Sequence, residues 1–315
     1  MLVRLRLMPA WVQPGSGPSA VPTLSRYVPV MTQRVVLITG CSSGIGLETA
    51  LAFARRGDTT VASMRNPAKA DPLMKRAADE GLAIDLVQLD VTDDASVTSA
   101  VTKVEREHGP IDVLVNNAGV GYDGAIETID IDRARAVFEA NVWGPIRVSR
   151  AVIPAMRARR SGAIINVTSV AGRVPGGAFM GFYGSSKHAM NTLSEALLDE
   201  LEPYGIRVVC IEPGFFTTEI MTNADDLPRG AGPYGAQHEW VLDFYRKSVA
   251  SVGGHPRVVA DAIVTAVDGP ATPLHRLVGD DAIGFVDLVT SLGSYEAWKP
   301  VGREIIEGVS GPRPS

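Results

Sequence analysis

The amino-acid sequence predicts an α/β fold, a doubly wound parallel sheet in a single domain, from two observations. Short apolar runs rich in Val and Ile recur along residues 34–211, and ten or more residues with a helical pattern separate each run from the next. Strands and helices that alternate in this way form a parallel sheet with helices on both faces. Glycines, prolines and polar residues also gather directly after the runs, at the sheet edge where open α/β folds bind ligands.

The first expected strand, residues 34–38, leads directly into a glycine-rich turn. Residues 39–46 read Thr-Gly-Cys-Ser-Ser-Gly-Ile-Gly, and residues 47–57 follow with a helical pattern that stops at glycine. Glycines let the chain turn tightly and let a pyrophosphate approach the helix N-terminus, where free N–H groups and the helix dipole favour an anion. The sequence therefore predicts a dinucleotide phosphate site at this turn.

The later strands follow the same pattern, and most of them end at unusual residues. The third ends at Asp-Val, the fourth runs into Asn-Asn-Ala-Gly, the fifth ends at Thr-Ser and the sixth at Glu-Pro-Gly. All of these residues should meet at one edge of the sheet. The five strands after the first are expected at residues 58–64, 82–89, 111–115, 162–167 and 208–211.

After Gly214 the pattern loosens. Residues 215–250 carry several aromatic side chains among Pro, Gly and charged residues, and a long segment here predicts a lid over a substrate. A helix is expected at residues 257–267, a final strand at 277–278 and a last helix at 282–292.

The first thirty residues differ from the rest. Residues 1–30 hold five prolines and no periodic apolar pattern, so we expect a disordered extension, with the folded domain over residues 31–315. Translation that begins at Met31 is a sharper hypothesis, which detection of peptides from residues 1–26 in the native protein would exclude.

Composition narrows the function classes. A net charge of -5 disfavours nucleic acid as a partner, and no long apolar run predicts an integral membrane span. The only two cysteines, Cys41 and Cys210, make no disulfide framework and favour a cytoplasmic setting. Cys41 is either a thiol activated at the helix N-terminus or, the favoured interpretation, a small spacer. No histidines show metal-ligand spacing, and His188 is expected to pack or lie on the surface.

Tyr183 and Lys187 carry the strongest chemical signal. Four residues apart on a helix, the two side chains share one face. An ammonium beside a phenol favours the phenolate and so lowers the pKa of the tyrosine toward the range in which a general acid works. The pair therefore indicates a proton donor for a carbonyl, or an acceptor for an alcohol.

Together these motifs resemble those of the short-chain dehydrogenase/reductase family. The resemblance rests on residues 39–46, 116–119, 183–187 and 213–214 together with Asn141 and Ser169, all in the family's order, and it covers residues 31–220 closely. The glycine spacing, T-G-x-x-x-G-x-G, is similar to that of the single-domain branch. The resemblance implies a Rossmann-like fold and a dehydrogenase or reductase activity.

The resemblance also implies a role for each site residue. Tyr183 would be the acid/base, Lys187 would lower its pKa and bind the nicotinamide ribose, Ser169 would bond the substrate oxygen, and Asn141 would hold a water in a proton relay. Phe216 departs from the family's usual aliphatic residue, so only its backbone role is expected. The implied cofactor contacts, besides Tyr183 and Lys187, are Gly40, Ser42, Ser43, Gly44, Ile45, Gly46, Asp90, Val91, Asn117, Ala118, Gly119, Pro213, Gly214, Phe216 and Thr218.

Cofactor choice depends on the end of the second strand. An acidic residue there would bind the 2′-hydroxyl of NAD, but the chain reads Ser-Met-Arg-Asn over residues 63–66. Arg65 offers a guanidinium suited to a 2′-phosphate, which favours NADP(H) over NAD(H).

The expected reaction is hydride transfer between NADP(H) and a carbonyl or secondary alcohol. Apolar residues before Tyr183 and in the expected lid predict an apolar small-molecule substrate such as a ketone, steroid or retinoid. The alternative is a non-catalytic NAD(P)-binding redox sensor, which would need only the cofactor contacts. The resemblance further implies a homodimer or homotetramer.

Overall fold

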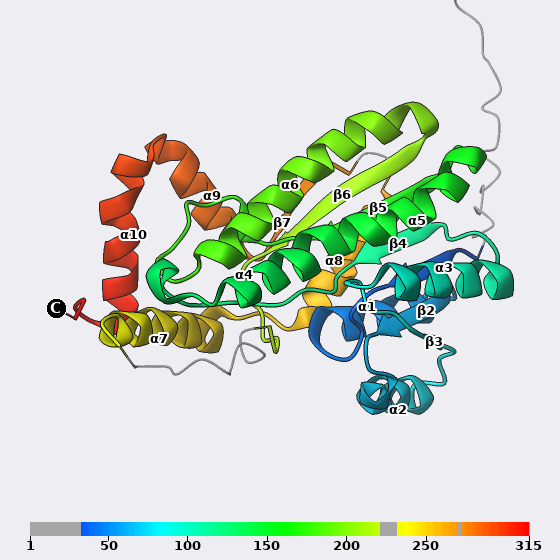
Figure 1. Cartoon of the computed structure of the whole chain (residues 1–315), viewed down its shortest axis with the longest axis horizontal. Coiled ribbons are helices and arrows are strands. Elements are labelled where there is room, and N and C mark those ends of the chain that lie inside the picture. Colours follow the sequence, from blue (N-terminus) through cyan, green and yellow to red (C-terminus); the bar gives the residue numbers. More distant parts are fainter. Residues whose placement is uncertain (1–32, 221–231, 270–271, 315) are drawn as a thin grey trace, which may run out of the picture. The chain divides into compact units, whose positions relative to one another are not determined.

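A computed structural model describes residues 33–220, 232–269 and 272–314. The expectations for residues 1–30, and for the part of the lid at 221–231, lie outside the described residues. The described chain contains one seven-stranded sheet in the order β3-β2-β1-β4-β5-β6-β7, and every neighbouring pair is parallel (Figure 1). Helices cover both faces, so the predicted doubly wound parallel sheet is confirmed.

The elements alternate along the chain as expected. The strands are β1 (Val35–Ile38), β2 (Thr59–Met64), β3 (Asp85–Gln88), β4 (Val113–Asn116), β5 (Gly162–Val167), β6 (Ile206–Pro213) and β7 (His275–Val278). The helices are α1 (Gly44–Arg55), α2 (Asp71–Asp79), α3 (Asp94–His108), α4 (Ile131–Phe138), α5 (Gly144–Arg159), α6 (Gly181–Leu201), α7 (Gly235–Val252), α8 (Pro256–Asp268), α9 (Asp280–Leu292) and α10 (Tyr295–Ser310).

The sheet is buried on both faces, and alternate residues of each strand enter different cores. In β1, Val36 and Ile38 pack against α1, α2 and α8, whereas Val35 and Leu37 pack against α3, α5 and α6. Side chains alternate across a strand, so a strand covered on both faces must be apolar at every position. This explains why the strands appear in the sequence as continuous apolar runs.

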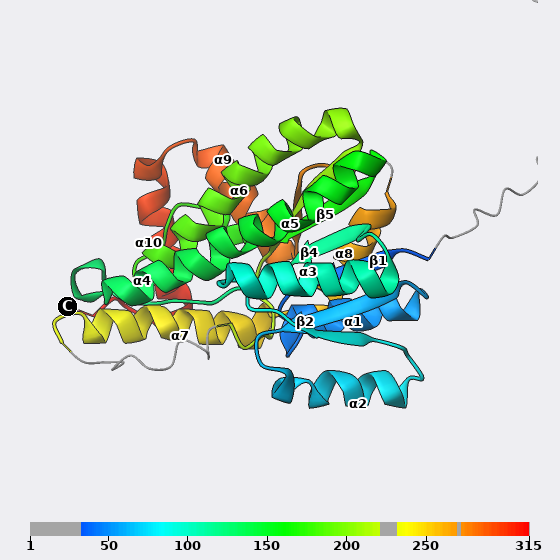
Figure 2. The same ribbon diagram turned by 45° about the vertical axis from the view of Figure 1, so that its right-hand side comes forward.

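The largest difference from the prediction lies at the C-terminus. The expected last helix, residues 282–292, is α9, and a further helix, α10, follows it. Pro300 stands inside α10, and proline and glycine are poor helix formers, which hid this helix in the sequence. The helix forms because an amphipathic face packs on α7; Figure 2 shows both helices at the same end of the molecule. Trp240 of α7 donates from Nε1 to the Gly311 carbonyl at 2.8 Å.

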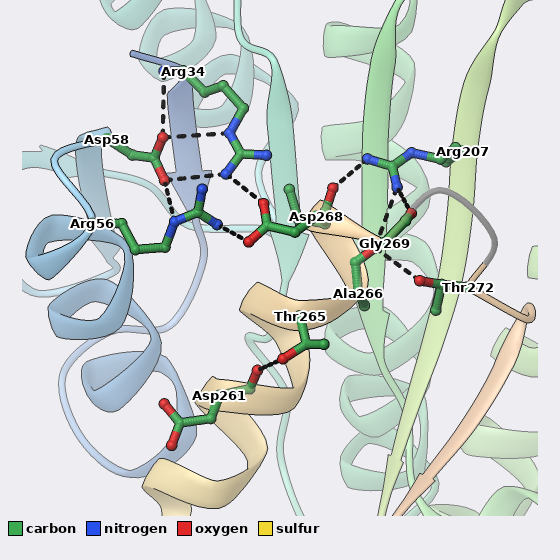
Figure 3. A network of polar contacts seen from close by, with 11 residues as sticks. Arg34, Arg56, Asp58, Arg207, Asp261, Thr265, Ala266, Asp268, Gly269 and Thr272 are labelled. Carbon is green, nitrogen blue, oxygen red and sulfur yellow. Dashed lines mark hydrogen bonds and ion pairs between the residues drawn. The ribbon is translucent and has the colours of Figure 1, made fainter. Parts of the chain in front are cut away.

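Arginines and aspartates link elements at the edge where the strands begin. Arg34 contacts Asp58 at 3.3 Å and Asp268 at 3.0 Å, and Arg56 also bonds Asp268 (Figure 3). Arg207 of β6 donates to the Gly269 carbonyl at 2.7 Å and to other carbonyls at the end of α8. These contacts join β1, β2, β6 and α8, so the opposite edge, where the strands end, is left for ligands.

Candidate active site

The glycine-rich turn joins β1 to α1 and leaves a helix N-terminus free. Gly46 faces the turn so closely that a Cβ there would lie 2.3 Å from the Gly40 carbonyl oxygen and 2.5 Å from Nδ2 of Asn117, so only glycine fits. The N-cap Ser43 makes no side-chain capping bond, and the first N–H groups of a helix have no partner within it. The turn therefore fits a pyrophosphate, with Ser42, Ser43 and Ile45 half-buried beside it.

Cys41 fits the interpretation of a small spacer residue in the turn. Its side chain is fully buried, Sγ lies 3.3 Å from the Ile38 carbonyl, and burial raises the pKa of the thiol to about 12. A thiol with a raised pKa is a poor nucleophile at neutral pH, so the structure favours a spacer over a thiol activated at the helix N-terminus.

The segment after β4 is bonded to the glycine turn. The Thr39 hydroxyl accepts hydrogen bonds from the backbone N–H groups of Asn117 and Ala118, both at 3.0 Å. The Asn117 amide donates back to the carbonyls of Thr39 at 2.9 Å and Gly40 at 3.0 Å. The Asn117 side chain thus holds the turn in place, and this accounts for its position in the motif.

Asn141 lies in a π-helical segment, Glu139–Trp143, between α4 and α5. Its side-chain amide donates to the Val120 carbonyl at 2.9 Å and to the Ser186 hydroxyl at 3.1 Å, and its oxygen accepts from the Val120 N–H at 2.8 Å. Asn141 therefore fixes the segment after β4 against the helix that carries Tyr183. Single π-helical turns are frequent at functional sites, because they redirect backbone groups.

Tyr183 lies in the first turn of α6, where its hydroxyl contacts Ser169. Tyr183 is only 8% exposed, and burial raises the pKa of its phenol, while a hydrogen bond with Ser169 partly lowers it. The expectation that Lys187 sets a lowered pKa for this tyrosine is wrong for the chain without a cofactor. Desolvation of the phenolate outweighs the hydrogen bond, and the opposing contribution comes from Ser169.

Lys187 points under the Tyr183 ring. Its Nζ lies 5.7 Å from the ring centroid and donates to the Val167 carbonyl at 3.1 Å. Burial lowers the pKa of the ammonium from 10.5 to about 8, because a low-dielectric setting disfavours the charged form. The group can therefore gain or lose a proton near neutral pH.

The run from Pro213 to Thr218 returns over the glycine turn. A Cβ on Gly44 would lie 3.5 Å from the Thr218 methyl, so Thr218 faces the start of α1. At Gly214 a Cβ would meet Asp281 Oδ2 at 2.1 Å, and the same oxygen accepts from the Phe215 N–H at 2.6 Å. Asp281, at the start of α9, therefore anchors this run.

The Phe216 side chain packs into the apolar core under the turn. It is buried among core residues, and a Cβ on Gly254 would lie 2.6 Å from its ring, because the two backbones form a bridge there. The side-chain role that the sequence left open is thus structural.

Arg65 and the pair after β3 lie farther along the same edge. Arg65 directly follows β2, is exposed, and within the described residues its guanidinium contacts no carboxylate. The Asp90 carboxylate accepts from the Thr92 N–H and hydroxyl at 2.9 and 2.7 Å. Val91 is buried beside Gly144, and neither member of the pair lines the cavity described next.

A cavity of about 690 Å³ opens beside Ser169, Tyr183 and Lys187. Its polar end contains Ser169, Tyr183 and Lys187, and its rim includes Ile45 and Asn117 from the nucleotide side. The remaining wall is largely apolar, and part of it comes from α7, α9 and α10. It includes Leu242, Phe244, Phe285, Trp298, Ile305 and Ile306.

Several wall residues escaped the sequence analysis. Asp123 lines the cavity, His238 bonds Asp123, and Asp281 holds the Pro213–Thr218 run. Tyr245, one of the aromatic residues of the expected lid, also lines the cavity. Asp123 carried the clearest signal, because it is a carboxylate shortly after the Asn-Asn-Ala-Gly motif at a strand's end. The cavity residues of α10 carried no such signal, because the sequence did not predict that helix.

Neither a metal site nor a membrane-spanning helix occurs among the described residues. Across the described ranges, no three His, Cys, Asp or Glu side chains are arranged to hold a metal ion. Among the helices described, none combines the length and apolar character that crossing a bilayer requires. His188 is exposed, and its Nδ1 lies 3.0 Å from the Gly184 carbonyl.

Two relatives extend over most of the chain. An uncharacterized oxidoreductase, YusZ of Bacillus subtilis, is 35% identical over 277 residues, which cover 86% of this chain and 98% of that protein. Retinol dehydrogenase 8 of Homo sapiens is 35% identical over 255 residues, which cover 77% of this chain and 80% of that protein.

Two solved structures share the fold. A short-chain dehydrogenase from Streptomyces avermitilis is 34% identical with a TM-score of 0.71, covering 87% of this chain and 98% of its own. A gluconate 5-dehydrogenase from Burkholderia cenocepacia, in complex with NADP and tartrate, is 28% identical with a TM-score of 0.64, covering 80% of this chain and 95% of its own.

The family model of short chain dehydrogenases matches residues 34–228, which include the glycine turn and the segment that carries Tyr183 and Lys187. The match, the relatives and the shared fold agree with the motifs and their geometry. The chain is an oxidoreductase of the short-chain dehydrogenase/reductase family.

Proposed function

We propose that the protein transfers a hydride between NADP(H) and the carbonyl or secondary alcohol of an apolar small molecule. The observation that carries this proposal is the meeting of Ser169, Tyr183 and Lys187 at the polar end of one largely apolar cavity. Pockets of this kind bind an apolar body and orient it through a few polar groups.

In the proposed reaction each polar side chain has one task. A bound nicotinamide cofactor supplies or accepts the hydride. The Ser169 hydroxyl donates to the substrate oxygen, and Tyr183 gives that oxygen its proton in reduction and takes it back in oxidation. Lys187 lies under the phenol, with Nζ 5.7 Å from the ring centroid, where it is expected to bind the nicotinamide ribose. Asn141 holds the segment after β4 against α6.

Relatives support an apolar substrate. The name of retinol dehydrogenase 8 states an apolar alcohol, and the apolar wall from α7 and α10 suits a substrate of similar character. The redox-sensor alternative would need only the cofactor contacts, so the grouping of Ser169, Tyr183 and Lys187 around one cavity favours an enzyme.

A panel assay tests the function. We expect NADPH oxidation with apolar ketones or retinoid aldehydes, measured by loss of absorbance, to exceed that with small polar ketones. If the protein binds NADPH but oxidises it with no carbonyl in a panel of ketones, steroids and retinoids, the sensor alternative would be favoured.

The preference for NADP(H) rests on Arg65. Its exposed guanidinium, free of carboxylates within the described chain, stands directly after β2, where the 2′ substituent of the adenosine ribose is expected. Several solved relatives are NADP complexes, including the gluconate 5-dehydrogenase.

We expect Arg65→Ala to weaken NADPH binding by roughly 10- to 100-fold, the size of a charge-assisted hydrogen bond. NADH binding should change little, since that cofactor has no 2′-phosphate. Fluorescence titration of both cofactors measures the two dissociation constants. Equal losses for NADPH and NADH would contradict the assignment of Arg65.

A further inference from the structure

The loop after β4 places a carboxylate in the wall of the substrate cavity. Asp123 is completely buried and lines the cavity. Its Oδ1 accepts a hydrogen bond from Nε2 of His238 at 2.9 Å, whereas Oδ2 has no hydrogen-bond partner within the described residues. A buried carboxylate oxygen without a donor is costly, so native structures almost always supply one.

Three segments that are far apart in the sequence hold Asp123 in place. Its neighbour Gly124 donates from its N–H to the Phe179 carbonyl at 2.8 Å, in the turn before α6. The Phe179 ring lies 4.9 Å from the ring of His238, which belongs to α7. Phe179 has a φ of 65°, and a left-handed conformation at such a residue persists only where its surroundings impose it. The carboxylate is therefore positioned by the fold.

Asp123 and Tyr183 line the same cavity. Tyr245 of α7 lines the same cavity, and the pKa of its phenol is raised mainly by burial and further by Tyr183 and Asp123. Tyr245 is thus near both groups, and a substrate with its carbonyl at Tyr183 could extend past Tyr245 toward Asp123.

We propose that the substrate carries a second polar group, a hydroxyl or an ammonium, that donates to Oδ2 of Asp123 while its carbonyl faces Tyr183. His238 is a positioning residue, because it bonds Oδ1 and leaves Oδ2 without a partner among the described residues. The proposal rests on the proposed reductase function and adds a substrate class to it: an apolar chain or ring system with a hydrogen-bond donor at a fixed distance from the carbonyl.

A chain-length series tests this. The probes are straight-chain 2-alkanones of increasing length and their ω-hydroxy and ω-amino counterparts. The readouts are kcat/KM with NADPH and, independently, calorimetric dissociation constants for the protein saturated with NADP⁺. At one chain length we expect the donor to raise kcat/KM and affinity about tenfold or more, as for a hydrogen bond to a charged group. A larger gain with the ω-hydroxy ketones identifies the donor as a hydroxyl, and a larger gain with the ω-amino ketones identifies it as an ammonium.

Two variants of Asp123 and one matched control sharpen the result. Asp123→Leu should abolish the gain, and Asp123→Asn, which can still bond His238, should keep only a part of it. Glu127→Gln is the control. It weakens the 2.6 Å hydrogen bond from the Tyr234 hydroxyl, which links the same loop to the start of α7, but Glu127 does not line the cavity. The control should keep the full gain, whereas a general loosening of α7 would reduce it in all three variants.

The outcomes separate the two proposals. If 2-alkanones are reduced but no donor improves kcat/KM or affinity at any length, the second contact is overturned and the reductase function remains. If no ketone is reduced while the donor still improves affinity in an Asp123-dependent manner, the reductase function fails and the contact remains. No reduction together with no difference in affinity overturns both.

Discussion

Replacing Tyr183 by Phe is expected to lower kcat for carbonyl reduction by about 10²- to 10⁴-fold, the contribution typical of a positioned general acid. The substitution removes one hydroxyl and leaves the ring that packs over Lys187. NADPH binding should therefore change far less than kcat. Steady-state NADPH oxidation with the best ketone of the panel measures the first quantity, and fluorescence titration the second.

Tyr245→Phe is the matched control for this prediction. Tyr245 is a second phenol in the same cavity; it is half-buried, and burial raises its pKa as well. Loss of its hydroxyl should change kcat by less than about tenfold, because it is not expected to transfer the proton. If both variants lost activity equally, the proton donor would not be Tyr183 in particular.

Local sequence pattern predicted the strands wherever burial on both faces required continuous apolar residues. β5 has the predicted bounds, Gly162–Val167. β3 is shorter than expected, because the Leu82 N–H bonds the Ala77 carbonyl at 2.8 Å and so belongs to the turn that ends α2. An apolar side chain enters the core equally well from a turn, so hydrophobicity alone could not place that boundary.

The candidate site likewise contains a part that local motifs predicted and a part that they did not. The glycine turn and the Tyr183–Lys187 pair are short motifs whose spacing carries their geometry, and both lie where the sequence placed them. Asp123 and His238 stand 115 residues apart, and their contact depends on how α7 packs against the loop after β4. No periodic pattern in the sequence indicates a contact between residues that are this far apart. The pKa of Tyr183 was mispredicted for a related reason: depth of burial is a property of the whole fold.

Lys187→Met is expected to lower catalytic activity and, separately, to change the free energy of unfolding. Loss of the ammonium should lower kcat/KM for carbonyl reduction by about 10²- to 10³-fold, as for the removal of one electrostatic stabiliser in an active site. The same change removes a charge that the fold buries at a cost, since burial lowers the pKa of Lys187 from 10.5 to about 8. Its effect on the free energy of unfolding should therefore depend on pH.

The sign of that dependence follows from proton binding. Below about pH 8 the amine is protonated in both the folded and the unfolded chain, and above 10.5 in neither. Between these values only the unfolded chain binds the proton, so the contribution of Lys187 to the free energy of unfolding rises with pH. The difference between parent and Lys187→Met should accordingly shift by roughly 3 kcal/mol in favour of the parent across this interval.

Urea unfolding of both proteins at several pH values between 7 and 10.5 measures this shift. Taking the difference between the two proteins cancels the other groups that titrate in the interval, such as Cys41, whose burial raises its pKa. Lys75→Met, at an exposed position of α2, is the control for the loss of a lysine ammonium outside the site. A flat difference for Lys187→Met would mean that the ammonium is hydrated in solution. A rising one, together with the lost activity, would mean that the fold sacrifices neutral-pH stability to keep a titratable amine beneath Tyr183.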